Sequence, residues 1–283
     1  MSHAQLEQTG ELSLGQAVAL GLLHGPAELL PISSSGHVTL IPWLLGWNYE
    51  ELDPELRKSF EVALHAGTAA ALLITLRDEV RDTMRSSSPR LALLIGLSFI
   101  PPATAGYLLE GTIEKRLGRP GSVAAGLVAG SVALWAANRA TGRRGREDAT
   151  VTDALWLGAA QASALMPGIS RNGATVAAAR RRGFSPAEAN VLSRHVALPI
   201  IAAATARRAL HGRMHVPSRQ RASLVAGTLA SFLSTLGSSR IIGRVEQKPS
   251  LLPYVAYRLA LAGLVGGRSI AIRPGPPNHR SER

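Results

Sequence analysis

Two short polar segments hold the side chains best suited to chemistry. The first reads HGPAELLPISSSGH over residues 24–37, and the second reads PGISRNGAT over residues 167–175. Both lie within strongly apolar sequence, where ionisable and polar groups at membrane depth are costly and usually serve a function. The two segments are therefore the candidate site.

Each polar segment contains a turn, and these two turns together with Arg171 have the properties of an anion-binding site. Turns rich in serine and glycine expose backbone N–H groups, and a helix is predicted to begin directly after each turn, so its positive end also attracts an anion. Arg171 adds a planar, permanently charged group suited to two-point contact with phosphate. Taken singly, each feature has an ordinary structural explanation, such as a common turn or an Arg–carboxylate pair. Taken together, they favour a phosphate-handling site.

The first segment adds a candidate nucleophile and a candidate base. Ser33, Ser34 and Ser35 supply hydroxyl groups, one of which can act as a nucleophile if a neighbouring base takes its proton. His37 follows Ser34 by three residues, which is one turn if a helix begins there, and is such a base. Glu28 could act as a base or hold a hard divalent cation. The segment therefore predicts phosphoryl chemistry.

The composition narrows the class of protein. Of the 283 residues, 46% are hydrophobic and 18% are charged, and none is cysteine. The high apolar content excludes intrinsic disorder, and the lack of cysteine excludes disulfide scaffolds, zinc–thiolate sites and a thiol nucleophile. The net charge of +12 would suit nucleic-acid binding, but only 4% of residues are aromatic and no basic stretch contains aromatic residues for base stacking. The basic residues instead flank apolar stretches, as beside membrane helices, so no nucleic-acid partner is expected.

Long apolar windows predict membrane-spanning helices. About 20 apolar residues cross a hydrocarbon core about 30 Å thick. The windows are rich in Gly, Ala and Ser, which allows membrane helices to pack closely. A buried soluble helical bundle is the alternative, and it explains the windows poorly. Three windows carry no charge and three are shorter, giving about six predicted spans at residues 91–109, 121–138, 222–239, 62–76, 196–206 and 251–265.

The two polar segments each divide an apolar region into arms too short to cross a membrane. Residues 14–30 and 38–47 flank the first turn, while residues 154–166 and a short piece ending at Arg180 flank the second. In lipid, such non-helical backbone is tolerated only where it is buried in protein or lines a wet cavity. Each region is therefore predicted to form a re-entrant helical hairpin.

The chain also resembles itself at one constant offset. Three spans are predicted after each hairpin, and because three is odd, the second half would be inverted relative to the first, as in many transporters. Chance similarity between Ala- and Gly-rich stretches is the alternative. The matches are Gly21 with Gly158, Ala27 with Ala164, Ile32 with Ile169, Ser33 with Ser170 and Gly36 with Gly173. The predicted parts are a first repeat (1–140), a cytoplasmic linker (141–153), an inverted second repeat (154–270) and a flexible basic tail (271–283).

The basic residues indicate an orientation for these spans. No lysine or arginine precedes Arg57, so the N-terminus is expected outside, and it lacks the basic region of a signal peptide. The basic loop over residues 77–90 and the linker are expected inside. The basic run at 207–221 and the C-terminal tail would lie outside, which departs from the rule that basic residues are enriched on the cytoplasmic side.

Together the two polar segments resemble a known family. GLLHGPAELLPISSSGH followed by PGISRNGAT is similar to the bacterial undecaprenyl-diphosphate phosphatases, the bacitracin-resistance membrane proteins. The resemblance extends over nearly the whole chain, including FEVALHAG at 60–67, ALP at 197–199 and the late pair Tyr257–Arg258. It implies an all-α integral membrane fold with an inverted repeat and two re-entrant hairpins.

The resemblance also implies an activity. Family members remove the terminal phosphate of undecaprenyl diphosphate at the outer side of the bacterial cytoplasmic membrane, with a divalent cation, Mg²⁺ or Ca²⁺. This reaction recycles the cell-wall lipid carrier and confers bacitracin resistance. The expected partners are therefore a polyprenyl diphosphate and membrane lipids, and the oligomeric state is left open.

Carried over by position, the resemblance implies roles for individual residues. Ser34 is the expected nucleophile, His37 an acid, base or orienting group, and Glu28 the second carboxylate of the family's first motif. Arg171 is expected to bind the diphosphate and to serve in catalysis. Phosphate contacts are expected from Ser33, Ser35, Gly36, Ser170, Arg171, Asn172, Gly173 and Thr175.

Two positions depart from the family pattern. His24 stands where the family usually has the first Glu of an E-x-x-x-E pattern, and Asn172 stands where it usually has Ser. Positions 24 and 28 share one helix face, so His24 and Glu28 could still hold a metal ion. A His–Glu pair offers less negative charge to Mg²⁺ or Ca²⁺ than two carboxylates, which leaves the metal preference and the activity open.

Two other functions would use the same features. A polyprenyl-phosphate transporter or flippase needs the anion site but no nucleophile. A divergent relative could bind lipid phosphate without turnover. Because fold alone does not choose among these functions, the behaviour of a Ser34 variant is the discriminating observation.

Overall fold

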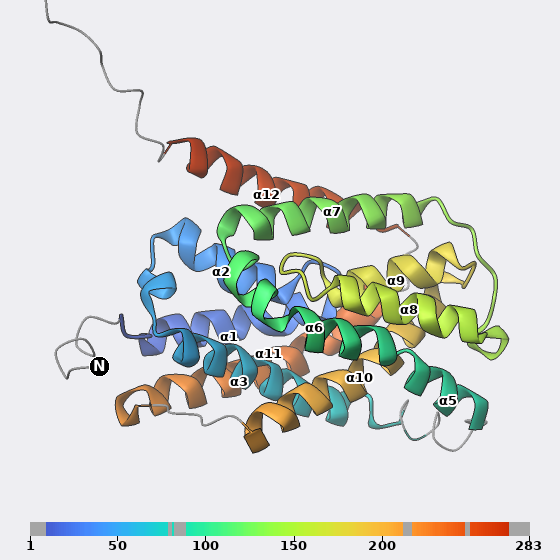
Figure 1. The fold of residues 1–283 in the computed structure, drawn as a ribbon, viewed down its shortest axis with the longest axis horizontal. Coiled ribbons are helices and arrows are strands. Elements are labelled where there is room, and N and C mark those ends of the chain that lie inside the picture. The colour runs from blue at the N-terminus through green and yellow to red at the C-terminus, as the bar shows by residue number, and fades with distance from the viewer. Residues whose placement is uncertain (1–9, 79–80, 82–88, 212–216, 247–249, 272–283) are drawn as a thin grey trace, which may run out of the picture.

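The computed structural model describes residues 10–78, 81, 89–211, 217–246 and 250–271. Within them the fold is all-α, as predicted, and β-pairing is limited to two isolated bridges, Gly10–Leu52 and Arg144–Phe184. Most helices run along the long axis of the molecule (Figure 1). The helices are α1 (Leu14–Leu29), α2 (Ser34–Leu45), η2 (Asn48–Glu51), α3 (Pro54–Thr75), α5 (Pro89–Leu97), α6 (Ile100–Arg116), α7 (Pro120–Asn138), η3 (Arg146–Asp148), α8 (Val151–Ser163), α9 (Arg171–Arg181), α10 (Pro186–His211), η4 (Ser218–Gln220), α11 (Arg221–Glu246) and α12 (Leu252–Ala271).

The first polar segment forms the turn of a helical hairpin made by α1 and α2. A capping box between Ser13 and Gln16 starts α1, which ends just before Pro31. Ser33 caps α2 by accepting a hydrogen bond from the Gly36 N–H at 3.2 Å. Its φ of 77° is costly for a residue with a side chain and is found mainly at functional sites.

The second polar segment forms the corresponding turn between α8 and α9. Thr150 and Asp153 form the capping box of α8, and Ser170 caps α9 through the Gly173 N–H at 3.1 Å. Gly168 has a φ of 93°, which favours glycine, and it packs against the backbone of α7. The caps Ser33–Gly36 and Ser170–Gly173 occupy the positions that the internal sequence match aligns. The sequence repeat therefore corresponds to a repeated local structure.

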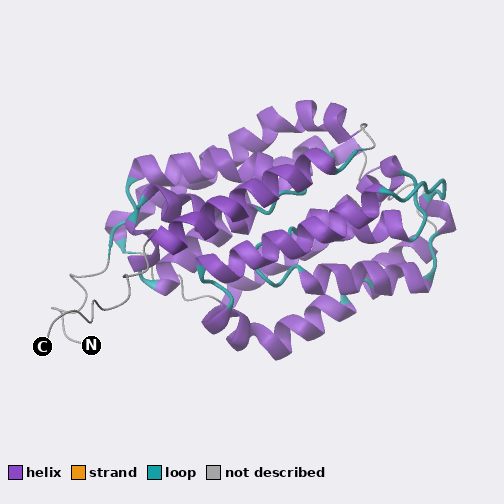
Figure 2. Ribbon diagram, turned by 90° about the horizontal axis from the view of Figure 1, so that it is seen from above, coloured by secondary structure: helices purple, strands orange, loops and turns teal. Residues whose placement is uncertain are grey.

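The helices that follow each hairpin surround both turns. Helix α1 packs along α11, and α11 packs against α3. On the other side, α8 packs against α5 and α6, and α9 packs against α7 and α10. Two further pairs, α7 with α12 and α3 with α10, join the two halves of the chain. The view from above shows the helices side by side, with loops mainly at the two ends of the bundle and some within it (Figure 2).

The apolar windows are helical, with one break. Among the described residues, Pro89–Leu109 and Pro120–Asn138 are the helical stretches long and apolar enough to cross a membrane. The first is interrupted at Ser98 and Phe99 between α5 and α6, beside two prolines that remove backbone donors. The predicted windows 62–76, 196–206, 222–239 and 251–265 fall on α3, α10, α11 and α12, which contain 62–75, 196–206, 222–239 and 252–265.

The segment between α7 and α8 is tied to the start of α8 by an ionic cluster. Asp153 accepts hydrogen bonds from Arg144 Nη2 at 2.8 Å and from Arg182 Nε at 2.6 Å. Burial raises the pKa of the Asp153 carboxyl, but the hydrogen bonds from Arg144, Arg182 and Thr150 outweigh this and hold the pKa well below its usual range. The predicted linker, 141–153, covers most of this segment and the first three residues of α8. Of the predicted tail, 271–283, all but Ala271 lies outside the described residues.

Candidate active site

A cavity of about 940 Å³ lies between the two hairpin turns and helices α3, α6 and α10. One set of lining residues is polar and comes from the end of α1, the turns and the helix starts, while the other is apolar and comes mainly from α6, α10 and the second turn. The polar set includes Glu28, Ser33, Ser34, Ser35, Ser170 and Arg171. The apolar set includes Phe99, Pro102, Tyr107, Leu165, Ile169 and Ile200.

The Glu28 carboxylate connects the two turns. Its Oε1 accepts a hydrogen bond from Arg171 Nη2 at 2.5 Å, and its Oε2 accepts one from Ser34 Oγ at 2.5 Å. The Glu28 side chain is nearly buried, at 7% exposure. The predicted nucleophile, carboxylate and phosphate-binding arginine therefore lie together, although residues 28 and 171 are far apart in the sequence.

The serine triplet is held by hydrogen bonds within its own turn. The Ser33 hydroxyl caps α2 and lies 3.3 Å from the Ser35 hydroxyl. Ser34 is the first residue of α2, where backbone N–H groups have no partner inside the helix. The Ser34 hydroxyl therefore sits at the positive end of a helix, on a carboxylate that can accept its proton.

His37 is not hydrogen-bonded to Ser34. Its Nδ1 donates to the Ser33 carbonyl at 2.7 Å, and its Nε2 lies 2.6 Å from the Tyr257 hydroxyl. The His37 ring is fully buried and is not among the residues that line the cavity. This geometry suits an orienting role, because His37 holds the strained backbone of Ser33, and it makes Glu28 the base nearest to Ser34.

The second turn places its residues in two different directions. Arg171 and Asn172 line the cavity, and Asn172 Nδ2 also donates to the Leu29 carbonyl at 2.6 Å. Thr175 is fully buried, and its hydroxyl contacts the Ser193 hydroxyl at 2.6 Å. Thr175 does not line the cavity, so this geometry gives no support to the phosphate contact expected from it.

Gly36 and Gly173 also lie outside the cavity lining. The N–H of each donates to the hydroxyl of its capping serine, Ser33 or Ser170. These two N–H groups therefore stabilise the turns and do not form the expected phosphate cradle. The amides of Ser34 and Arg171, at the first helical positions, are better placed for that role.

Arg258 has a structural role that sequence reasoning did not assign. It is fully buried in α12 and donates hydrogen bonds to the carbonyls of Pro31 at 3.0 Å and Gly168 at 2.9 Å, one from each turn. It also bonds the Leu127 carbonyl of α7. An arginine in the middle of an apolar window was the sequence signal for such a role.

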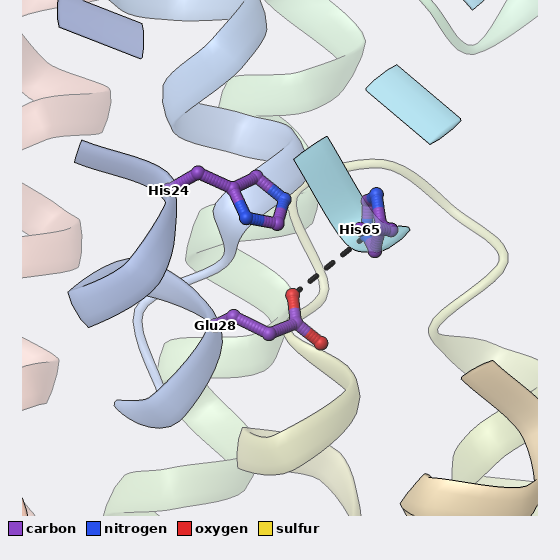
Figure 3. Close-up of side chains that lie close together, drawn as sticks. All are labelled: His24, Glu28 and His65. Atoms are coloured by element: carbon purple, nitrogen blue, oxygen red, sulfur yellow. Dashed lines mark ion pairs between the residues drawn. The ribbon is translucent and has the colours of Figure 1, made fainter. Parts of the chain in front are cut away.

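His65 is the second residue that sequence reasoning missed. It comes from α3 and places its Nε2 3.8 Å from Glu28 Oε2 (Figure 3). One donor atom each from His24, Glu28 and His65 lies within 4.8 Å of the others. The His24 Nε2 is buried and has no hydrogen-bond partner among the described residues. Two imidazoles and a carboxylate with an unused buried nitrogen fit a divalent cation.

Comparison with known proteins shows the family of the chain. Residues 17–264 match the protein family described as Bacitracin resistance protein BacA. The chain is 36% identical to the undecaprenyl-diphosphatase of Pelobacter propionicus over 269 residues, covering 90% of this chain and 96% of that protein. It is also 36% identical to the undecaprenyl-diphosphatase of Geobacter sulfurreducens over 271 residues, covering 90% of this chain and 97% of that protein. The chain therefore belongs to the bacitracin resistance protein BacA family.

Proposed function

We propose that the protein is a membrane phosphatase that hydrolyses undecaprenyl diphosphate to undecaprenyl phosphate and inorganic phosphate. The observation that carries this proposal is the Ser34 hydroxyl bonded to Glu28, beside Arg171, in a large cavity with an extensive apolar wall. The name of both relatives, undecaprenyl-diphosphatase, supports the same substrate. Recycling the lipid carrier in this way would confer resistance to bacitracin, the property that the family is named for.

The chemistry can be written with the residues of this site. Glu28 takes the proton of Ser34 as Ser34 Oγ attacks the terminal phosphorus, and the bond from that phosphorus to the bridging oxygen breaks. Glu28 passes the proton to the departing phosphate oxygen, so undecaprenyl phosphate leaves and a phosphoserine remains. The Glu28 carboxylate then takes a proton from water as that water attacks the phosphoserine. Glu28 returns this proton to Ser34 Oγ as the bond from Oγ to phosphorus breaks, which releases phosphate and restores the serine hydroxyl.

Arg171 and the helix starts stabilise the charge on the phosphate oxygens. Glu28 accepts one of the five N–H donors of the Arg171 guanidinium, which leaves the planar group able to bind the diphosphate as well. The positive end of α2 lies at the first turn, and the positive end of α9 lies at the second turn. The apolar cavity wall, with Phe99, Tyr107 and Ile200, suits the first isoprene units of the lipid.

A divalent cation is the proposed cofactor. Glu28 and His24 are the expected ligands, and the family resemblance implies Mg²⁺ or Ca²⁺. When bound, the cation would neutralise charge on the phosphate oxygens. The unused His24 Nε2 supports the involvement of His24.

The proposed architecture is an inverted repeat of two re-entrant hairpins and about six spans. The packing of α1 against α11 and of α8 against α6 supports it, because these pairs correspond under the repeat. Contacts between chain segments at the helix ends support alternating spans. The Leu12 N–H donates to Gln220 and Arg268 donates to the Leu44 carbonyl at one end, while the Leu251 N–H donates to Asn138 at the other.

The proposed location is the bacterial cytoplasmic membrane. The linker 141–153 would face the cytoplasm, between a first repeat at 1–140 and an inverted second repeat at 154–270. The N-terminus would lie outside, and the site would open to the outer side. The scarcity of basic residues before Arg57 supports this orientation.

A phosphate-release assay with matched serine variants tests the function. Ser34→Ala should lower phosphate release from undecaprenyl diphosphate in detergent by roughly two to four orders of magnitude, with little change in lipid affinity measured separately. Ser35→Ala is the control and should be milder, because water can replace a hydrogen bond within the turn. Wild-type release from Ser34→Ala would exclude Ser34 as the nucleophile. Lipid binding without release by the wild-type protein would favour a transporter or an inactive relative.

A further inference from the structure

The protonation of His24 can be assigned from its hydrogen-bond network. His24 Nδ1 lies 3.0 Å from Thr68 Oγ1, which lies 2.8 Å from Ser231 Oγ, and Ser231 Oγ lies 2.8 Å from the Leu64 carbonyl. A carbonyl can only accept, so the Ser231 hydroxyl donates to it and accepts from Thr68. Thr68 then accepts from His24, and the proton is on His24 Nδ1.

This assignment leaves the His24 Nε2 as an acceptor without a donor. The side chain is fully buried, and Nε2 has no hydrogen-bond partner among the described residues. Buried polar atoms are normally satisfied, and each exception calls for an explanation such as an ion. The His24 ring lies 4.6 Å, centroid to centroid, from the ring of His65.

His65 has the same arrangement as His24. Its Nδ1 donates to the Glu61 carbonyl at 2.8 Å, so in the neutral ring Nε2 is the nitrogen that can bind a metal ion. That Nε2 lies 3.8 Å from Glu28 Oε2 and belongs to a residue that lines the cavity. Metal-binding histidines are usually held in this way, with the second ring nitrogen donating to a protein oxygen that fixes the tautomer.

The three donor atoms are close to the spacing of a metal site. One ligand atom of each residue, a ring nitrogen or a carboxylate oxygen, lies within 4.8 Å of the other two, and Figure 3 shows the side chains converging from α1 and α3. Tetrahedral bonds of about 2.0–2.1 Å place ligand atoms roughly 3.3 Å apart, so small side-chain rotations suffice. Two histidines and one carboxylate with an open fourth position are a common catalytic zinc arrangement.

We infer that His24, Glu28 and His65 bind a transition-metal ion of the Zn²⁺ or Co²⁺ type in preference to Mg²⁺ or Ca²⁺. Imidazole nitrogen favours such ions, whereas Mg²⁺ and Ca²⁺ prefer carboxylate, carbonyl and water oxygens. This metal site would be part of the proposed phosphatase site, and a catalytic role for the ion rests on that proposed function. The open position would face the cavity, where Glu28 Oε2 also accepts the Ser34 hydroxyl hydrogen bond.

Binding of Co²⁺ to the purified full-length protein in detergent tests the site without an activity measurement. Protein stripped with a chelator and titrated with Co²⁺ should bind one ion per chain and develop the visible absorption of four- or five-coordinate Co²⁺. Zn²⁺ should displace the signal stoichiometrically, and Mg²⁺ or Ca²⁺ in large excess should not. No binding, or displacement by Mg²⁺ at comparable concentration, would overturn the inference.

Two variants and a control separate ligation from folding. His65→Gln should weaken Co²⁺ binding by about 100-fold or more, and Thr68→Val, which removes the nearer of two acceptors for His24 Nδ1, by about 10–100-fold. His195→Gln changes a buried histidine outside the trio and should leave binding unchanged. Equal affinity in His65→Gln and wild type would overturn the assignment.

A gain-of-function variant makes the test independent of damage to the fold. His24→Glu supplies two carboxylates four residues apart and should shift the preference toward Ca²⁺ and Mg²⁺ by at least about tenfold relative to Co²⁺. An unchanged preference would exclude His24 as a ligand. Phosphate release with Mg²⁺ and no Co²⁺ binding would refute the metal site alone, and Co²⁺ binding without phosphate release would refute the phosphatase alone.

Discussion

At the residue scale, Glu28 determines how the candidate site is assembled. Its two carboxylate oxygens hold Ser34 and Arg171, which come from separate hairpins, at 2.5 Å each. The nearly buried position shields these hydrogen bonds from water, which strengthens them. Glu28 therefore positions both groups and is also the nearest base to the serine.

The shape of the Arg171 side chain is testable separately from its charge. Arg171→Lys keeps the positive charge but loses the planar two-point contact, so kcat/KM for undecaprenyl diphosphate should fall at least tenfold, about 1.4 kcal/mol in transition-state binding. Steady-state kinetics in detergent measures this change. Arg139→Lys, at the end of α7 outside the cavity lining, is the matched control. Wild-type kinetics for Arg171→Lys would exclude the two-point contact.

At the element scale, the two turns are fixed to each other by a helix that belongs to neither. Arg258 of α12 donates to the Pro31 carbonyl of the first turn and to the Gly168 carbonyl of the second. The caps Ser33 and Ser170 determine where α2 and α9 begin. Local caps thus shape each turn, and Arg258 sets the distance between them.

Replacing this arginine should destabilise the protein. Arg258→Lys keeps the charge but replaces the separate nitrogens that bond Pro31 and Gly168 with a single nitrogen, so we expect at least one buried carbonyl to lose its partner. We expect a cost of about 2 kcal/mol and a Tm lower by about 4–8 °C in detergent. The exposed Arg268→Lys, also on α12, should change Tm far less. An unchanged Tm for Arg258→Lys would mean that other contacts hold the turns together.

At the scale of the whole molecule, polar groups are buried in the interior beside the apolar core, and many large apolar side chains are exposed. Arg258, His24 and Thr235 are fully buried, whereas Tyr107 is 85% exposed and Leu108 is 68% exposed. An apolar surface of this kind is expected where lipid is the solvent. The distribution supports the proposed membrane location independently of the family resemblance.

Single-cysteine labelling tests the membrane orientation, because the chain has no cysteine of its own. Asn48→Cys should react with a membrane-impermeant maleimide in intact cells, whereas Thr141→Cys should react only after permeabilisation. Both positions are exposed. The reverse pattern would invert the proposed orientation. Labelling of both in intact cells, or recovery of the protein in the soluble fraction after carbonate washing, would contradict the proposed spans.

The sequence by itself determined the helices, the two turns and the residues in them. Serine caps, prolines and apolar windows act over a few neighbouring residues, so they can be recognised in the amino-acid sequence alone. The internal match aligns Ser33 with Ser170, and each of these serines caps the helix that follows it. The all-α class and the family followed from the same local signals.

Only the tertiary structure decided which of these side chains meet. The sequence made His37 the candidate partner of Ser34 because they are one helical turn apart, but the packed hairpin brings Glu28 to Ser34. His65 and Arg258 reach the site from α3 and α12, and no local pattern ties them to it. Such contacts depend on how distant helices pack, which is set by the balance of burial and hydrogen bonding over the whole chain.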